Sequence, residues 1–177
     1  MKVAVFGGSF NPPHVGHAMV ASWLRWTERA DEVWLLPTFH HAFDKSLAPF
    51  EHRVRACEAL ASVIGPAVRV ETVERELPTP SYTVRTLDAL QNRHPTFIFR
   101  FVIGADVLPQ LPQWREWSRL SAVYDPIVVG RGATSVPGAP TFPEVSSTEI
   151  RRRISAGEAI DHLVPAPVIR AMGSAWA

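Results

Sequence analysis

The residues best suited to do chemistry lie in one short stretch, residues 7–17, which reads GGSFNPPHVGH. His14 and His17 are three positions apart, so they share one face if the chain is helical here. Gly7 and Gly8 let the backbone turn sharply, and the N–H groups of such a turn can hold phosphate oxygens. Imidazoles at the start of a following helix suit a phosphate whose negative charge grows during a reaction. The stretch therefore predicts a site that handles phosphate groups.

This stretch is not one of the common phosphate-binding loops. No Gly-Lys-Ser/Thr follows the glycines, as a Walker loop requires, and the spacing differs from the G-x-G-x-x-G fingerprint of dinucleotide-binding folds. The alternative interpretation is a plain strand-to-helix turn that carries two surface histidines. The glycines, Asn11, the prolines and both histidines all fall in one connection, which favours the functional interpretation. Gly16 has no side chain, which predicts that something bulky passes between the histidines.

The segments around this stretch alternate between strand and helix patterns. Apolar runs predict buried strands at 2–6, 33–36, 67–73, 97–103 and 123–129. Helical spacing predicts helices at 14–29, 54–64, 82–93, 112–120, 147–155 and 166–173. This order indicates an α/β fold, a Rossmann-like, doubly wound, five-stranded parallel sheet with helices on both faces. Ligands bind such a sheet beyond the carboxyl ends of its strands, so the residues that follow each strand are the candidate site.

The composition is that of a globular protein with a sizeable core. The chain has 177 residues, of which 46% are hydrophobic and 20% charged. Its net charge of +1 argues against a protein that grips nucleic acid through a basic face. Cys57 is the single cysteine and lies on the apolar face of its predicted helix, where we expect it to pack inertly. No stretch approaches the ~20 apolar residues of a membrane span, and the N-terminal apolar run is too short for a signal peptide, so we expect a cytoplasmic protein.

Four segments together resemble a known enzyme family. The run GGSFNP followed by His14-x-Gly16-His17 resembles the signature of the HxGH nucleotidyltransferases. Three later segments resemble bacterial nicotinate-nucleotide adenylyltransferases: PSYTVRTL at 80–87, FVIGAD then LPQW within 101–114, and VSSTEIR at 145–151. The four occur in the order of the family, which is more specific than any one motif.

The resemblance implies an enzyme that transfers AMP from ATP to nicotinate mononucleotide. The products would be nicotinate adenine dinucleotide and pyrophosphate, within NAD biosynthesis, and Mg²⁺ would accompany ATP. It also implies a single nucleotidyltransferase domain over residues 1–177, whose C-terminal helices, from about residue 146, complete the ATP site.

Site residues follow from the same resemblance. We expect His14, His17 and Arg151 to be catalytic, with His17 on the α-phosphate in the transition state. The expected ATP site comprises Gly8, Ser9, Phe10, Gly16, Gly104, Asp106, Arg131, Ser147 and Thr148. The expected mononucleotide site comprises Asn11, Lys45, Thr83, Trp114 and Arg115. No protein metal site is expected, because ATP and water would hold Mg²⁺.

Several of these residues also have a purely structural interpretation. Thr83 begins a helix, whose free N–H groups can hold a carboxylate or simply be capped. Trp114 offers a flat face for a pyridine ring, or packs in the core. Asp106 follows a strand, where it can bind a ribose or only close a turn. Residues 146–149 form a capping box, and Arg151, one turn on, can reach anionic oxygens at that helix start.

The loop after the second predicted strand departs from the family pattern. Residues 37–45 read PTFHHAFDK where the family usually shows a Pro-Pro-His-Lys-like stretch. His41 and Lys45 could replace the family's basic residues, and we expect the loop to fold over the mononucleotide phosphate. His40, His41 and Asp44 could instead be metal ligands, but no fourth ligand is evident.

Two other functions stay open at this point. The acceptor could be nicotinamide mononucleotide or another phosphate, because acid and amide differ by one charge at the same ring position. The chain could also be a non-catalytic nucleotide-binding relative, against which the intact histidines and Arg151 count. Nothing in the sequence indicates the oligomeric state.

Overall fold

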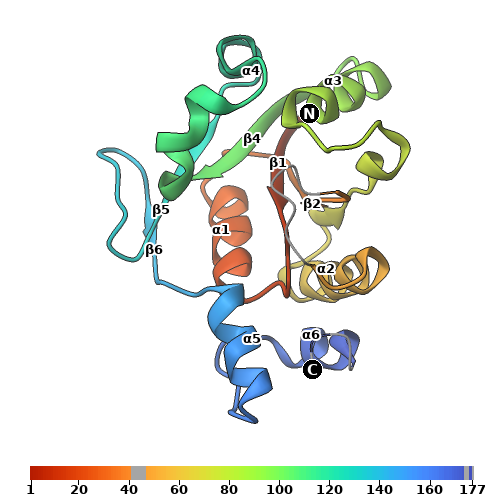
Figure 1. Cartoon of the computed structure of the whole chain (residues 1–177). Helices are drawn as coiled ribbons and strands as arrows, with labels where there is room; N and C mark the ends of the chain where they lie inside the picture. The colour runs from red at the N-terminus through yellow and green to blue at the C-terminus, as the bar shows by residue number, and fades with distance from the viewer. Residues whose placement is uncertain (41–46, 174–175, 177) are drawn as a thin grey trace.

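The computed structural model describes residues 1–40, 47–173 and 176, and its centre is one parallel sheet (Figure 1). The strands are β1 (Lys2–Gly8), β2 (Glu32–Pro37), β3 (Val68–Val70), β4 (Ile98–Gly104), β5 (Ile127–Arg131) and β6 (Thr141–Phe142). Their order is β3-β2-β1-β4-β5-β6, and all neighbouring strands pair in parallel. The order reverses between β1 and β4, which confirms the doubly wound α/β fold.

Helices cover both faces of the sheet. They are α1 (Val15–Trp26), α2 (Phe50–Ile64), α3 (Thr83–Arg93), α4 (Trp117–Tyr124), α5 (Ser147–Ser155) and α6 (Ala166–Met172), with 3-10 helices η1 (Val73–Glu76) and η2 (Ala105–Gln113). Figure 1 shows α1, α2 and α6 on one side of the sheet and α3 and α4 on the other. No described helix is long and apolar enough to cross a bilayer.

Strand β1 is buried from both sides, as its continuous apolar run predicts. Ala4 belongs to the core cluster that contains Leu24 of α1 and Leu60 of α2. Val3 and Val5 point to the opposite face and belong to the cluster that contains Leu87 of α3. Both clusters therefore fix the strand whose carboxyl end carries the glycine-rich stretch.

The sheet has six strands rather than the five expected. The additional strand, β6, is two residues long and lies inside the region expected to be a loop, where no alternating pattern could reveal it. It pairs beside Gly130, whose N–H donates to the Pro140 carbonyl at 2.7 Å. The strand expected at 67–73 shortens to β3, because the chain enters η1 at Val73.

The segment between β4 and β5 also differs from expectation. The helix expected at 112–120 is replaced by η2 and then α4, because Pro109 and Pro112 lack the N–H groups that an α-helix needs. Residues 123 and 124 end α4, so β5 begins only at Ile127. The inert packing expected of Cys57 is confirmed: its side chain is fully buried, and burial raises the pKa of the thiol.

Candidate active site

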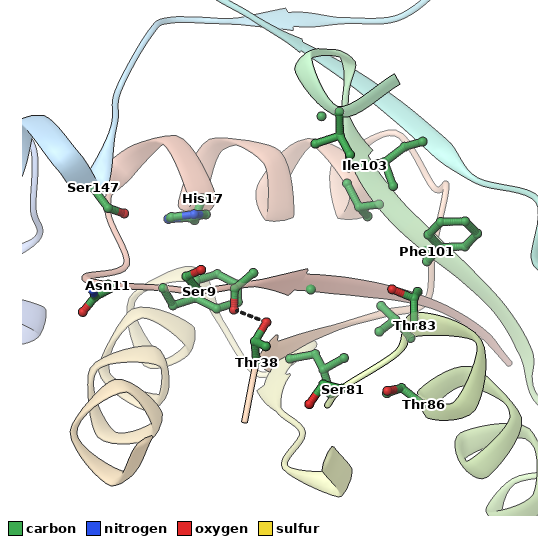
Figure 2. Close-up of a pocket in the computed structure, with 18 of the residues that line it drawn as sticks. Ser9, Asn11, His17, Thr38, Ser81, Thr83, Thr86, Phe101, Ile103 and Ser147 are labelled. Carbon is green, nitrogen blue, oxygen red and sulfur yellow. Dashed lines mark hydrogen bonds between the residues drawn. The ribbon is translucent and has the colours of Figure 1, made fainter. Parts of the chain in front are cut away.

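A cleft of about 930 Å³ opens at the carboxyl edge of the sheet, beside the ends of β1 and β4 where the strand order reverses. This is the place at which a doubly wound sheet binds its ligand. The cleft brings together most of the residues that the sequence predicts for the site: Gly8, Ser9, Phe10, Asn11, His14, His17, Thr83, Gly104, Asp106, Trp114, Arg115, Arg131, Ser147, Thr148 and Arg151. Figure 2 shows the residues around β1 and α5 near one end of the cleft and Thr83 and Thr86 of α3 near the other.

The rings of His14 and His17 lie against each other at the start of α1, with their centroids 3.8 Å apart and their planes tilted by 32°. The backbone N–H of His14 donates to Nδ1 of His17 at 3.1 Å. Because Nδ1 accepts that bond, the proton of the neutral His17 ring sits on Nε2. The rings of Phe10 and Phe6 lie 4.7 and 5.7 Å from the His17 ring and limit its movement.

Both imidazoles are neutral at pH 7. Burial lowers the pKa of His14 to about 4, and the charge of Arg131 adds to the effect. Burial also lowers the pKa of His17 well below its usual value, and the charges of Arg131 and of a protonated His14 act in the same direction. His17 is therefore a neutral hydrogen-bond donor rather than a cation, and the cationic groups that the described residues place at this end are arginines.

Residues from distant segments hold the loop that follows β1. Asn11 Oδ1 accepts hydrogen bonds from the Ala48 N–H at 3.1 Å and the Trp176 Nε1–H at 2.7 Å. The carbonyl of Asn11 accepts from Arg151 Nη1 at 2.6 Å, and the carbonyl of Pro12 accepts from Ser147 Oγ at 2.8 Å. Although Asn11 lines the cleft, its side-chain oxygen is used in hydrogen bonds that stabilise the loop.

The two remaining glycines of the predicted site make room for side chains of the protein itself. A Cβ on Gly16 would lie 3.0 Å from the ring of His14, so the bulky group that passes this glycine is His14. Gly16 is outside the residues that line the cleft. A Cβ on Gly104 would clash with the carboxylate of Asp106, whose Oδ2 receives a hydrogen bond from Arg131 Nη2 at 3.1 Å.

The opposite wall combines aromatic rings with positive charge. Thr83 is the first residue of α3 and lines the cleft, so the helix start, whose first N–H groups have no partner within the helix, lies at this wall. The guanidinium groups of Arg85 and Arg115 each lie 5.1 Å from the ring centre of Tyr82. Trp114 packs edge-on against Trp117, with the ring centres 6.3 Å apart. This wall can receive a flat ring that carries a negative charge.

Comparison with known proteins identifies the family. The model of the Cytidylyltransferase-like family matches residues 5–153. A protein of Anaeromyxobacter sp. (strain K), named "Probable nicotinate-nucleotide adenylyltransferase", is 47% identical over 173 residues, which cover 96% of this chain and 92% of the relative. The nicotinate-nucleotide adenylyltransferase of Bacillus subtilis (strain 168) is 34% identical over 174 residues, 93% of this chain and 91% of the relative. This chain belongs to the nicotinate-nucleotide adenylyltransferase family.

Two solved structures of a nicotinic acid mononucleotide adenylyltransferase share the fold. The structure of Plasmodium falciparum nicotinic acid mononucleotide adenylyltransferase complexed with NaAD superposes with a TM-score of 0.78 at 20% identity, covering 97% of this chain and 94% of that one. The complex of the same protein with APC gives a TM-score of 0.74 at 20% identity, with the same coverage. These structures show the shared fold, and the relatives at 47% and 34% identity confirm the family that the four sequence segments resemble.

The adenylyltransferase cleft also contains residues that the sequence did not point to. Glu74 is buried, and its carboxylate accepts hydrogen bonds from the Phe39 N–H at 2.9 Å and from Thr86 Oγ1 at 3.1 Å. The Thr38 N–H donates to the Gly8 carbonyl at 2.9 Å. Glu74 follows β3 at the ligand edge of the sheet, which is the signal that could have found it.

The divergent loop is only partly described. His41, Asp44 and Lys45 lie outside the described residues, so the phosphate-binding and metal-binding interpretations of this loop stay predictions. His40 is described and is exposed, and its N–H lies 3.4 Å from Ser81 Oγ.

Proposed function

We propose that the cleft carries out the reaction of its family, transfer of the adenylyl group of ATP to nicotinate mononucleotide. The phosphate of the mononucleotide attacks the α-phosphorus of ATP in line, the bond to the β-phosphate oxygen breaks, and pyrophosphate leaves. A phosphate acceptor is already ionised at pH 7, so the reaction needs neither a strong base nor a covalent enzyme intermediate. The work of the protein is to position two polyanions and to stabilise charge on the α-phosphoryl oxygens.

The observation that carries this proposal is the fixed histidine pair at the carboxyl edge of β1. His17 Nε2–H would donate to an α-phosphoryl oxygen, and its orientation is set before substrate binds by the His14 N–H on the other ring nitrogen. A prepositioned donor needs no reorganisation as charge develops. His14 would contact phosphate alongside it.

The remaining groups at this end fit the rest of ATP. The backbone of Gly8, Ser9 and Phe10 would bind phosphate oxygens, and Gly104 and Asp106 the ribose. Arg131, beside Asp106, would line the same pocket. Ser147, Thr148 and Arg151 would hold the departing phosphates at the start of α5, where the helix dipole favours negative charge.

The residues at the nucleotide end fit a Mg²⁺ ion that is bound chiefly by ATP. Asp106 is the carboxylate beside the nucleotide end, and it is engaged by Arg131, so the triphosphate oxygens and water would supply most ligands of the ion. When bound, Mg²⁺ neutralises phosphate charge.

The wall around α3 fits the acceptor. Trp114 would stack on the pyridine ring, while the N–H groups at Thr83 and the cationic Arg115 would bind its carboxylate. The guanidinium groups of Arg85 and Arg115 lie beside Tyr82 at this wall, and a cation there would favour the carboxylate of the acid over the uncharged amide group.

Pyrophosphate release tests the proposal. The purified chain is supplied with ATP and Mg²⁺, and then with nicotinate mononucleotide, nicotinamide mononucleotide or no acceptor. We expect release with nicotinate mononucleotide to exceed release with the amide by at least about tenfold in kcat/KM, the scale of one charge-assisted hydrogen bond. A preference for the amide would refute the acceptor assignment. Binding of ATP without release above the no-acceptor control would indicate the non-catalytic alternative.

A further inference from the structure

Arg53 is a charged residue in an unusual place, the buried face of α2. Its side chain is only 2% exposed and lies beside core residues such as Val54 and Cys57. A guanidinium so far from water is costly unless its N–H groups have partners. The partners in the described part of the chain are two backbone carbonyls: Nε donates to Ala48 at 2.9 Å, and Nη1 donates to Ser9 at 3.0 Å.

The bond to Ser9 sets the direction of one peptide group. The Ser9–Phe10 peptide is trans, so its N–H points opposite to its carbonyl. The carbonyl is directed to Arg53, which lies outside the cleft lining, whereas Ser9 and Phe10 both line the cleft. The Phe10 N–H is therefore turned to the cleft side, and no backbone partner for it is found among the described residues.

The backbone at Phe10 requires such support. Its φ of 45° is in the left-handed region, which bulky residues rarely adopt. Its ring is 1% exposed and lies 4.7 Å from the ring of His17, so a change in this peptide would also disturb the histidine. One buried side chain thus stabilises both the N–H direction and the packing under His17.

We infer that Arg53 is a positioning residue for ATP, which holds the Ser9–Phe10 peptide so that the Phe10 N–H is presented to a phosphate oxygen. The inference rests on the proposed function, because it takes the nucleotide phosphates to lie on this loop. Arg53 touches no substrate itself and acts through the backbone.

The test compares Arg53→Met, Arg53→Lys and Arg55→Met, the last a matched control because Arg55 is exposed on the same helix. The measurements are the ATP dissociation constant by calorimetry, kcat, both Michaelis constants and the melting temperature. For Arg53→Met we expect ATP binding and kcat/KM for ATP to weaken by about tenfold or more, with less than about threefold change in the mononucleotide KM. Arg53→Lys keeps donors for the carbonyls and should recover part of the loss, and Arg55→Met should match the wild type.

A double variant separates positioning from general stability. If Arg53 acts on the loop that also orients His17, Arg53→Met should cost less in a His17→Ala background than in the wild type. Equal losses in both backgrounds, equal changes in both Michaelis constants, or ATP binding within twofold of the wild type would each overturn the inference. If Arg53→Met does not fold, the same split between the two Michaelis constants is read from Arg53→Lys. Should the wild type release no pyrophosphate, the proposed function fails, while the ATP titrations still decide the role of Arg53.

Discussion

The two ends of the cleft are built differently. The loop after β1 is held by hydrogen bonds from residues far away in the sequence, among them Arg53, Arg151, Ser147 and Trp176, and most of these bonds are buried or half-buried. The wall around α3 also carries a buried hydrogen bond, from Thr86 Oγ1 to Glu74 at 3.1 Å. Its ion pairs are exposed, such as the pairing of Arg115 with Glu116 at 3.8 Å and of Arg119 with Asp88 at 2.8 Å.

This difference matches the two tasks of an adenylyltransferase. Negative charge develops at the nucleotide end during the reaction, and small errors in the position of a hydrogen-bond donor there lower the rate. A rigid geometry that is formed before the substrate binds is therefore useful at this end. At the acceptor end the protein distinguishes a carboxylate from an amide on the ring. The N–H groups of a helix start and nearby cations can do this without being held rigidly. Changes at the nucleotide end should therefore reduce turnover strongly, whereas changes at the acceptor end should mainly alter selectivity.

The largest effect is expected from His17→Ala. Loss of the prepositioned Nε2–H donor should lower kcat by about 100-fold or more, with a smaller change in the KM for ATP. Steady-state kinetics measure this, and circular dichroism checks the fold. His162→Ala, which changes an exposed histidine, serves as the control, and near-normal turnover of folded His17→Ala would remove His17 from the mechanism.

Neighbouring arginines on α5 give the next contrast. Arg151→Ala removes a cation and the donor to the Asn11 carbonyl, and should lower kcat/KM for ATP by roughly 10- to 100-fold, the scale of a charged hydrogen bond. Arg152→Ala removes exposed pairs with Glu149 and Glu158, and should change activity by less than about twofold and stability by less than about 1 kcal/mol. Similar activity losses in the two variants would contradict the assignment of Arg151 to the site.

At the acceptor end, Thr83→Pro removes one backbone N–H from the start of α3. Proline is tolerated at the first position of a helix, so the helix itself should be kept. We expect the preference for nicotinate over nicotinamide mononucleotide to fall from at least about tenfold to less than about threefold, because the lost donor is worth more to a carboxylate than to an amide. Thr83→Ser keeps the N–H and should keep the preference. If Thr83→Pro selects the acid as strongly as the wild type, the N–H groups at the start of α3 do not distinguish the acid from the amide.

The last prediction concerns stability at acidic pH. Because the pKa of His14 is lowered from 6.5 to about 4 in the folded state, the unfolded chain binds more protons between these values. The contribution of this histidine to the free energy of unfolding should have its full value above about pH 6.5. The free energy of unfolding should then fall as the pH drops toward 4, by up to ~1.4 kcal/mol per pH unit for one histidine.

Denaturant titrations across this pH range measure the slope, and His17, whose pKa is also lowered, adds to it. A His14→Gln variant should show a shallower slope than the wild type, whereas His162→Gln should not. Identical slopes in wild type and His14→Gln would show that His14 is not held neutral.

Sequence reasoning found the parts of this site that are local in the chain. The histidine pair, the start of α3 at Thr83 and the alternation of strands and helices each leave a pattern within a few residues. The contacts that hold the first loop do not, because Arg53 lies 44 residues from Ser9 and Trp176 lies 165 from Asn11. Arg53 still left a trace, a charged residue four positions before Cys57 in the apolar stripe of its helix. The two-residue β6 is too short to show any period.

The most direct test follows the α-phosphate itself. ATP labelled with ³²P at the α-position is incubated with Mg²⁺, nicotinate mononucleotide and either the wild type or His17→Ala, and the products are separated by chromatography. We expect the label in nicotinate adenine dinucleotide with the wild type, and transfer slower by about 100-fold or more with the variant. Label appearing as free AMP, or remaining in ATP with the wild type, would contradict adenylyl transfer to the mononucleotide as the function of this chain.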